Sequence, residues 1–166
     1  MALEAHGSPW PKGLVVDMAA IDLGRRLLSG AALEHWLPHR GHMLQINAIV
    51  SESADFSEGV AVKHVRDDEF WVAGHFPGRP MMPGVMQVEA AAQLAVVLYN
   101  RRRNEPLTAA FTRLEDCSFR SMVVPGDTLY LLCKGIKWSR RGFTCHVQGV
   151  TDHRLTFDAK IQGLSV

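Results

Sequence analysis

The chain has 166 residues, which is enough for one domain with its own hydrophobic core. Its net charge of +1 creates no overall field that would select nucleic acid, and its apolar runs are too short to span a membrane. The three cysteines, Cys117, Cys133 and Cys145, are odd in number and lack a metal-binding spacing, so we expect a reducing, cytoplasmic location without disulfides or structural zinc.

The first thirty residues are expected to form a partly helical N-terminal extension ahead of a single domain over residues 31–166. Residues 1–13 contain several prolines, glycines and serines and lack the basic and apolar regions of a secretory signal. Apolar residues recur at helical spacing over 17–28, which predicts a helix there. A short helical turn is expected over 33–37.

The remaining elements alternate between strands and one long helix. Apolar and polar residues alternate over 43–49 and 59–65, which predicts two strands, and a shorter strand is predicted over 70–73. A long apolar helix is predicted over 83–100. Four further strands are predicted over residues 108–119, 128–138, 142–151 and 155–162. Together they indicate an α+β domain in which an antiparallel sheet wraps around the helix and buries it.

One segment is the most informative, and it reads GHFPGRPMMPGVMQVEAAAQ from Gly74 to Gln93. Pro83 begins the helix, and Glu89 is the only carboxylate within its apolar run. Because an ionised carboxylate is costly to bury, Glu89 either finds a partner or has a raised pKa and takes a proton. A protonated carboxyl group can act as a general acid, and His75 is the natural base to set beside it.

Both residues also have structural interpretations. Glu89 could be satisfied by a backbone donor or an ion pair, and His75 could cap the helix or pack in the turn. The prolines and glycines between them favour the functional interpretation, because they fix the direction of the backbone rather than build a core. The free amides at the helix start, including that of Gly84, would form a site for a developing oxyanion.

The same twenty residues resemble the signature of the 3-hydroxyacyl-(acyl-carrier-protein) dehydratases, a family with the hotdog fold. Two flanking stretches are similar to the family as well: Leu37-Pro38-His39-Arg40, and Phe119-Arg120 with the turn that follows it. Glutamate at position 89 points to the branch that dehydrates without isomerising the double bond. The chain departs from the family pattern at Gly41-His42 and at Asn47, which puts partner loops and substrate range in question.

The resemblance implies a hydro-lyase that converts (3R)-3-hydroxyacyl thioesters into trans-2-enoyl thioesters in fatty acid biosynthesis, with no cofactor and no metal. In this reading His75 removes the proton next to the thioester carbonyl, and Glu89 gives a proton to the departing hydroxyl. The Gly84 amide holds the carbonyl oxygen. The thioester would be carried by acyl carrier protein or by coenzyme A.

The resemblance also implies an assembly. A residue that leads into a helix and one that rides on it cannot easily meet within one chain, so we expect His75 and Glu89 to come from different subunits. The family implies a homodimer, or a hexamer made of three dimers. Residues expected to contact the substrate are Gly84, Val85, Phe76, Met82 and Met86, although the last three could also simply pack.

Basic and histidine-rich stretches admit two interpretations each. Arg101, Arg102 and Arg103 follow the helix directly, where they could complement its dipole or, with Arg140 and Arg141, dock an acidic carrier protein. His39 and His42 make an H-x-x-H pair, but no third ligand lies at metal-binding spacing. Three other functions stay open: a thioesterase of the same fold, an enoyl-coenzyme A hydratase, and a non-catalytic acyl-binding protein.

Overall fold

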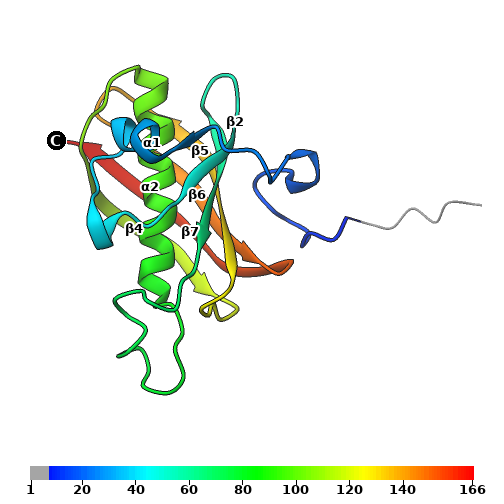
Figure 1. The fold of residues 1–166 in the computed structure, drawn as a ribbon. Coiled ribbons are helices and arrows are strands. Elements are labelled where there is room, and N and C mark those ends of the chain that lie inside the picture. Colours follow the sequence, from blue (N-terminus) through cyan, green and yellow to red (C-terminus); the bar gives the residue numbers. More distant parts are fainter. Residues whose placement is uncertain (1–7) are drawn as a thin grey trace, which may run out of the picture.

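The computed structural model of the chain describes residues 8–166. Within them a seven-stranded antiparallel sheet curls around one long helix, α2 (Gly84–Arg103) (Figure 1). The strand order is β1-β2-β3-β5-β6-β7-β4, and a short helix, α1 (Gly30–Trp36), precedes the second strand. The strands are β1 (Leu28–Ser29), β2 (Ala48–Glu52), β3 (Glu58–His64), β4 (Ala109–Phe119), β5 (Thr128–Trp138), β6 (Gly142–Thr151) and β7 (Arg154–Ser165). The α+β prediction is therefore confirmed.

Helix α2 forms the centre of the main core. Thirteen of its residues are buried, from Gln87 to Asn100, so the helix meets protein on nearly every side. Its apolar run contains several alanines, which let the inner face of the sheet approach closely. The helix ends at Asn104, whose left-handed backbone (φ 52°) lets its amide donate to the last carbonyls. The long helix predicted over 83–100 is confirmed.

The N-terminal segment packs on the opposite, outer face of the sheet. There Val16 and Met18 join a second apolar cluster formed by β2, β3, β5 and β6. The side chain of Gln148 holds the backbone in place, because it accepts from the Val15 amide (2.9 Å) and donates to the Gly13 carbonyl (3.3 Å). The helix predicted over 17–28 is wrong: only a 3₁₀ turn over Met18–Ala20 forms, followed by a turn that the Arg25 amide closes on the Asp22 carbonyl. The apolar residues of this segment are covered because they pack against the sheet face.

The loop over residues 65–83 projects beyond the beginning of α2 (Figure 1). The strand predicted over 70–73 is wrong, because the amides of Gly74 and His75 both donate to the Trp71 carbonyl and close turns instead. Trp71 itself is buried and anchors the loop. The first predicted strand also begins later than expected, at Ala48, after a 3₁₀ turn over Gly41–Met43.

Candidate active site

His75 lies in the projecting loop with one ring nitrogen fixed. Its Nδ1 is 2.7 Å from the Met81 carbonyl oxygen, which can only accept a hydrogen bond. The proton of the neutral ring therefore sits on Nδ1, and Nε2 keeps a free lone pair. The ring of Phe76 stacks on the imidazole at 4.2 Å between centroids. This arrangement suits His75 to act as a base through Nε2.

His75 shares a cleft of about 530 Å³ with the beginning of α2. Gly84, Val85 and Met82, three of the residues expected to contact the substrate, line this cleft, and Arg120 also lines it. Among the described residues no backbone carbonyl accepts from the Gly84 amide. A Cβ at Gly84 would lie 2.6 Å from the Phe119 ring, so a glycine is needed where ring and helix meet.

Two other residues expected to contact the substrate do not line this cleft. Phe76 stacks on the His75 ring, and Met86 packs against the core.

Glu89 lies further along α2 and faces a different cavity, of about 30 Å³. Its side chain is 26% exposed. Two donors approach the same oxygen: Oε1 is 2.8 Å from Gln93 Nε2 and 3.3 Å from His39 Nε2. Gln93 is itself held, because it accepts from the Gln45 amide and donates to the Met43 carbonyl.

Of the two outcomes expected for Glu89, a partner or a raised pKa, the single chain shows the first. Hydrogen bonding by His39, and then by Gln93, lowers the pKa of Glu89 from its ordinary value although burial acts in the opposite direction. Donors that favour the charged carboxylate thus outweigh its partial loss of solvent. The sequence shows an isolated carboxylate in an apolar run, but it does not show the two N–H groups that meet it.

One chain does not bring His75 and Glu89 together. They line separate cavities, and no hydrogen bond joins them within residues 8–166. Exposed apolar side chains lie beside both. Val85 lines the His75 cleft and is 69% exposed, and Phe111, which lines the Glu89 cavity, is exposed on the edge strand β4. Each half of the site therefore opens toward a surface that a second molecule could cover.

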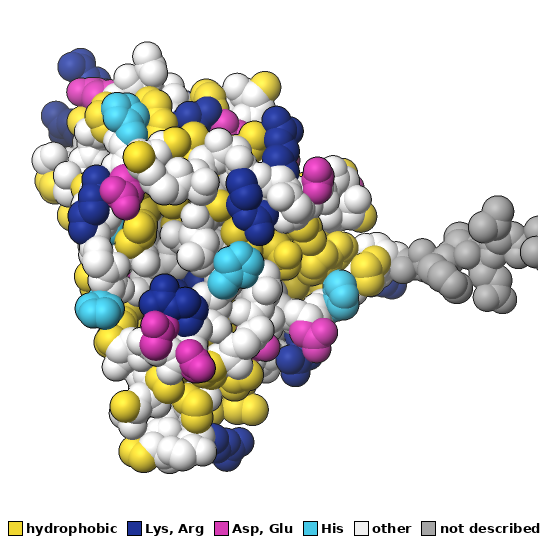
Figure 2. Space-filling model, viewed as in Figure 1, with side chains coloured by type: hydrophobic (Ala, Val, Ile, Leu, Met, Phe, Trp, Pro, Cys, Tyr) yellow, Lys and Arg dark blue, Asp and Glu magenta, His cyan; other side chains and the backbone are white. Residues whose placement is uncertain are grey.

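The arginine run after α2 is engaged by its own chain. Arg101 pairs with Glu52 at 2.6 Å and lies over the rings of Trp36 and Phe56. Arg102 donates to the Asp55 carbonyl, and Arg103 pairs with Glu105 at 3.2 Å. On the face shown in Figure 2, basic and acidic side chains are interspersed rather than gathered into one patch. The three arginines thus make contacts within their own chain, and their part in carrier docking stays a prediction.

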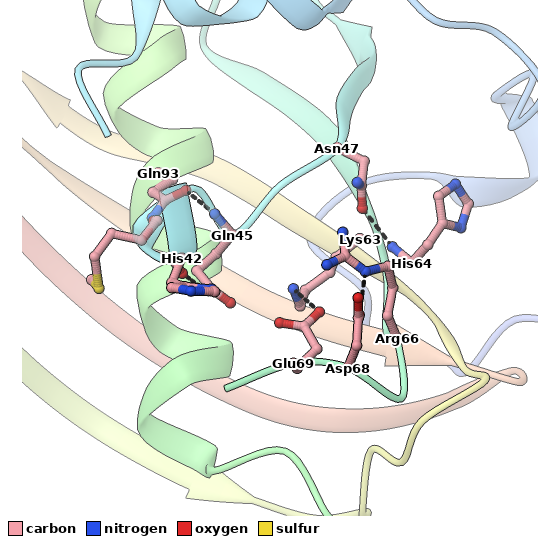
Figure 3. Close-up of polar contacts among 10 residues, drawn as sticks. His42, Gln45, Asn47, Lys63, His64, Arg66, Asp68, Glu69 and Gln93 are labelled. Carbon is pink, nitrogen blue, oxygen red and sulfur yellow. Dashed lines mark hydrogen bonds and ion pairs between the residues drawn. The ribbon is translucent and has the colours of Figure 1, made fainter. Parts of the chain in front are cut away.

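A polar cluster behind the Glu89 site was missed at the level of sequence. Lys63 and Glu69 form a buried pair at 2.8 Å, and Gln45 beside them reaches Gln93 through its backbone amide (Figure 3). The spacing of four residues between Glu89 and Gln93 was a readable signal, because such residues are neighbours on a helix. Within the described part of the chain, no three side chains are grouped to hold a metal ion, and no helix is long and apolar enough to cross a membrane.

Comparison with known proteins identifies the family. The model of the FabA-like domain matches residues 37–160. The 3-hydroxyacyl-(acyl-carrier-protein) dehydratase FabZ of Granulibacter bethesdensis is 34% identical over 146 residues, or 83% of this chain and 85% of that enzyme. FabZ of Bradyrhizobium diazoefficiens is 41% identical over 59% of this chain and 65% of that enzyme. The bifunctional enzyme LpxC/FabZ of Porphyromonas gingivalis is 40% identical over 66% of this chain, but only 24% of that enzyme is matched. The chain thus spans less than two thirds of the last two relatives.

Solved structures with little sequence identity share the architecture. A chain of the dehydratase heterocomplex ApeI:P from Xenorhabdus doucetiae superposes with a TM-score of 0.70 at 12% identity, covering 81% of this chain and 90% of that chain. A hypothetical thioesterase from Streptococcus pneumoniae, solved with coenzyme A, gives 0.54 at 10% identity over 71% of this chain and 84% of that chain. These likenesses confirm the expected hotdog fold, and together with the family match they show that the chain belongs to the FabA-like family.

Proposed function

We propose that the protein is a hydro-lyase that converts (3R)-3-hydroxyacyl thioesters into trans-2-enoyl thioesters and water in fatty acid biosynthesis. The relatives named above support this function. Their names include acyl carrier protein, which supports that protein as the carrier of the thioester. The observation that carries the proposal is the His75 cleft. A histidine with a free Nε2 and an unpartnered Gly84 amide lie in one cleft, as proton removal next to a thioester carbonyl requires.

Two chains would complete the site. His75 and Glu89 face different cavities, and exposed apolar side chains of β4 and the α2 start surround them. A dimer related by a two-fold axis would bring the His75 loop of each chain to the Glu89 cavity of its partner. Two equivalent sites would then form, each with one residue from either chain. A trimer of such dimers would keep the same site.

In the proposed reaction, His75 Nε2 takes the proton from the carbon next to the thioester carbonyl. The Gly84 amide donates to the carbonyl oxygen, where negative charge develops. Glu89 gives its proton to the hydroxyl on the third carbon, and water leaves. The two residues need one proton between them, and the pair is ready when Glu89 holds it and His75 is neutral. Because the pKa of Glu89 is lowered in the single chain, that form has to be favoured within the assembled site.

The decisive experiment offers purified protein a 3-hydroxybutyryl and a crotonyl thioester, each on acyl carrier protein and on coenzyme A. Absorbance of the enoyl thioester should rise with the first substrate and fall with the second, as one reversible reaction requires. A free thiol and a free acid would instead show a thioesterase. No change with any of the four substrates would leave an acyl-binding role. The ratio of rates on the two carriers identifies the preferred one.

A further inference from the structure

Glu89 is held by only one of its two carboxyl oxygens. Gln93 Nε2 at 2.8 Å and His39 Nε2 at 3.3 Å both approach Oε1. No donor within residues 8–166 meets Oε2. Gln93 cannot swing away easily, because its amide is fixed at both ends by Gln45 and Met43. The carboxyl group therefore has one anchored oxygen and one free oxygen.

Resting on the function proposed above, we propose that His39 is a positioning residue for the acid. Together with Gln93 it pins Oε1 of Glu89, so that Oε2 is the oxygen that carries the acid proton toward the substrate. The same two N–H groups hold the carboxylate that forms when the proton leaves. His39 thus decides both the orientation and the strength of the acid, although it does not touch the reacting atoms.

The chemistry of a carboxylic acid supports this assignment. An oxygen that already accepts two N–H bonds behaves as the carbonyl oxygen, so the proton resides on the other one. In the reaction the Oε2–H proton passes to the hydroxyl oxygen as the carbon–oxygen bond breaks, and the C2–H electrons form the double bond while His75 takes the proton. Glu89 is left as a carboxylate, whose charge is met at Oε1. Exchange with solvent then removes the proton from His75 and returns one to Glu89, so that the pair again holds a single proton.

The surroundings make His39 the one titratable neighbour of this carboxyl group among the described residues. The cavity beside it is lined, besides Gln93, by alanine, valine, phenylalanine and glycine residues of α2, β4, β6 and β7. No other charged side chain of α2 or these strands faces it. The lowered pKa of Glu89, caused first by the His39 hydrogen bond, agrees with an anchor that favours the charged form.

The test compares two replacements at position 39. His39→Leu removes the donor, whereas His39→Gln keeps an N–H group of similar reach. Loss of one hydrogen bond to a charged group should reduce kcat about tenfold or more in His39→Leu, with little change in KM. The alkaline limb of the kcat/KM profile, where Glu89 loses its proton, should move to higher pH, because the pKa of Glu89 rises when the donor is lost. His39→Gln should recover most of the rate, and His42→Gln, which alters an exposed histidine of the same segment, should match the wild type.

A carboxyl titration by NMR supplies a readout that does not need turnover. The pKa of Glu89 should rise in His39→Leu and stay low in His42→Gln. His39→Phe gives a second variant without a donor, should the leucine protein fail to fold. An active enzyme whose alkaline limb and Glu89 titration are the same in wild type and in both donor-free variants would overturn the role of His39. A wild type that is inactive on all four thioesters would overturn the proposed function instead, while the titration would still report on the anchor.

Discussion

The two histidines of the candidate site meet different partners through different ring nitrogens. His75 donates from Nδ1 to the Met81 carbonyl, which leaves Nε2 free to take a proton. His39 Nε2 lies 3.3 Å from Glu89 Oε1, and its buried Nδ1 has no partner among the described residues. One ring is thereby suited to act as a base and the other as a donor. The acceptor that each ring meets determines its role, and residue type alone does not.

The surroundings of the two rings differ as much as their partners. The His75 half lies on a projecting loop in an open cleft of about 530 Å³. The Glu89 half lies inside the fold beside a cavity of about 30 Å³, with its carboxyl group fixed by an internal network. A rigid half and a projecting half are what a site shared between two chains needs, because the projecting part must reach the partner.

Removing the acid or the base should have the largest effect. His75→Ala and Glu89→Gln should each lower kcat by roughly two orders of magnitude or more, the usual size for a lost general acid or base. Both proteins should fold, since His75 lies in a loop and Gln preserves the shape of Glu89. Steady-state kinetics with the enoyl assay measures the loss, and circular dichroism checks the fold. Near wild-type turnover in either variant would show that the residue has no such role.

Mixing these two inactive proteins should restore part of the activity. In a mixed dimer one site receives both intact residues and the other receives neither. If subunits exchange freely, half of the dimers are mixed, so about a quarter of wild-type activity should return, as two-fold symmetry requires. Sedimentation of the same samples gives the oligomeric state. A monomer with full activity, or no recovery after proven exchange, would rule out the shared site.

The sequence predicted the scaffold better than the site. Helix α2 and strands β5 and β6 were readable because their patterns are long and regular, and turn residues mark their ends. The segment over 17–28 was predicted wrongly, because apolar residues at helical spacing also suit a non-helical chain that packs on a sheet. The sequence left open whether Glu89 has a partner or a raised pKa, because one of its neighbours, His39, lies fifty residues earlier in the sequence. A contact between residues so far apart in the sequence cannot be predicted from the local residue pattern.

The arginines at the far end of α2 provide a test away from both halves. The side chains of Arg140 and Arg141 make no hydrogen bond within the described residues, whereas Arg101 pairs with Glu52. Arg140→Ser with Arg141→Ser should therefore lower kcat/KM several-fold on carrier-protein thioesters and weaken its dependence on salt. Turnover of coenzyme A thioesters should stay unchanged.

Arg101→Ser serves as the structural control for that pair. Its loss leaves Glu52 without a partner in a largely buried position, which should reduce the free energy of unfolding by roughly 1–2 kcal/mol. Both substrate types would then be affected alike, and only through the amount of folded protein. Equal kinetic losses on both carriers in the Arg140/Arg141 variant would argue against docking there.

The smallest expected effect concerns the stability that Glu89 itself contributes. Its pKa is lowered from the ordinary value of 4.5, first by the His39 hydrogen bond, so the folded state favours the carboxylate. That contribution is complete above pH 4.5 and is lost as the pH falls through the lowered value. Because the side chain is partly exposed, it should amount to less than about 1 kcal/mol. Urea unfolding at fixed protein concentration should give the wild type a larger free energy of unfolding than Glu89→Gln at pH 7. This difference should shrink as the pH falls. A difference in the free energy of unfolding that grows toward low pH would mean that burial has the larger effect on the pKa of Glu89 and keeps the carboxyl group neutral. That result would contradict the anchoring by His39 and Gln93.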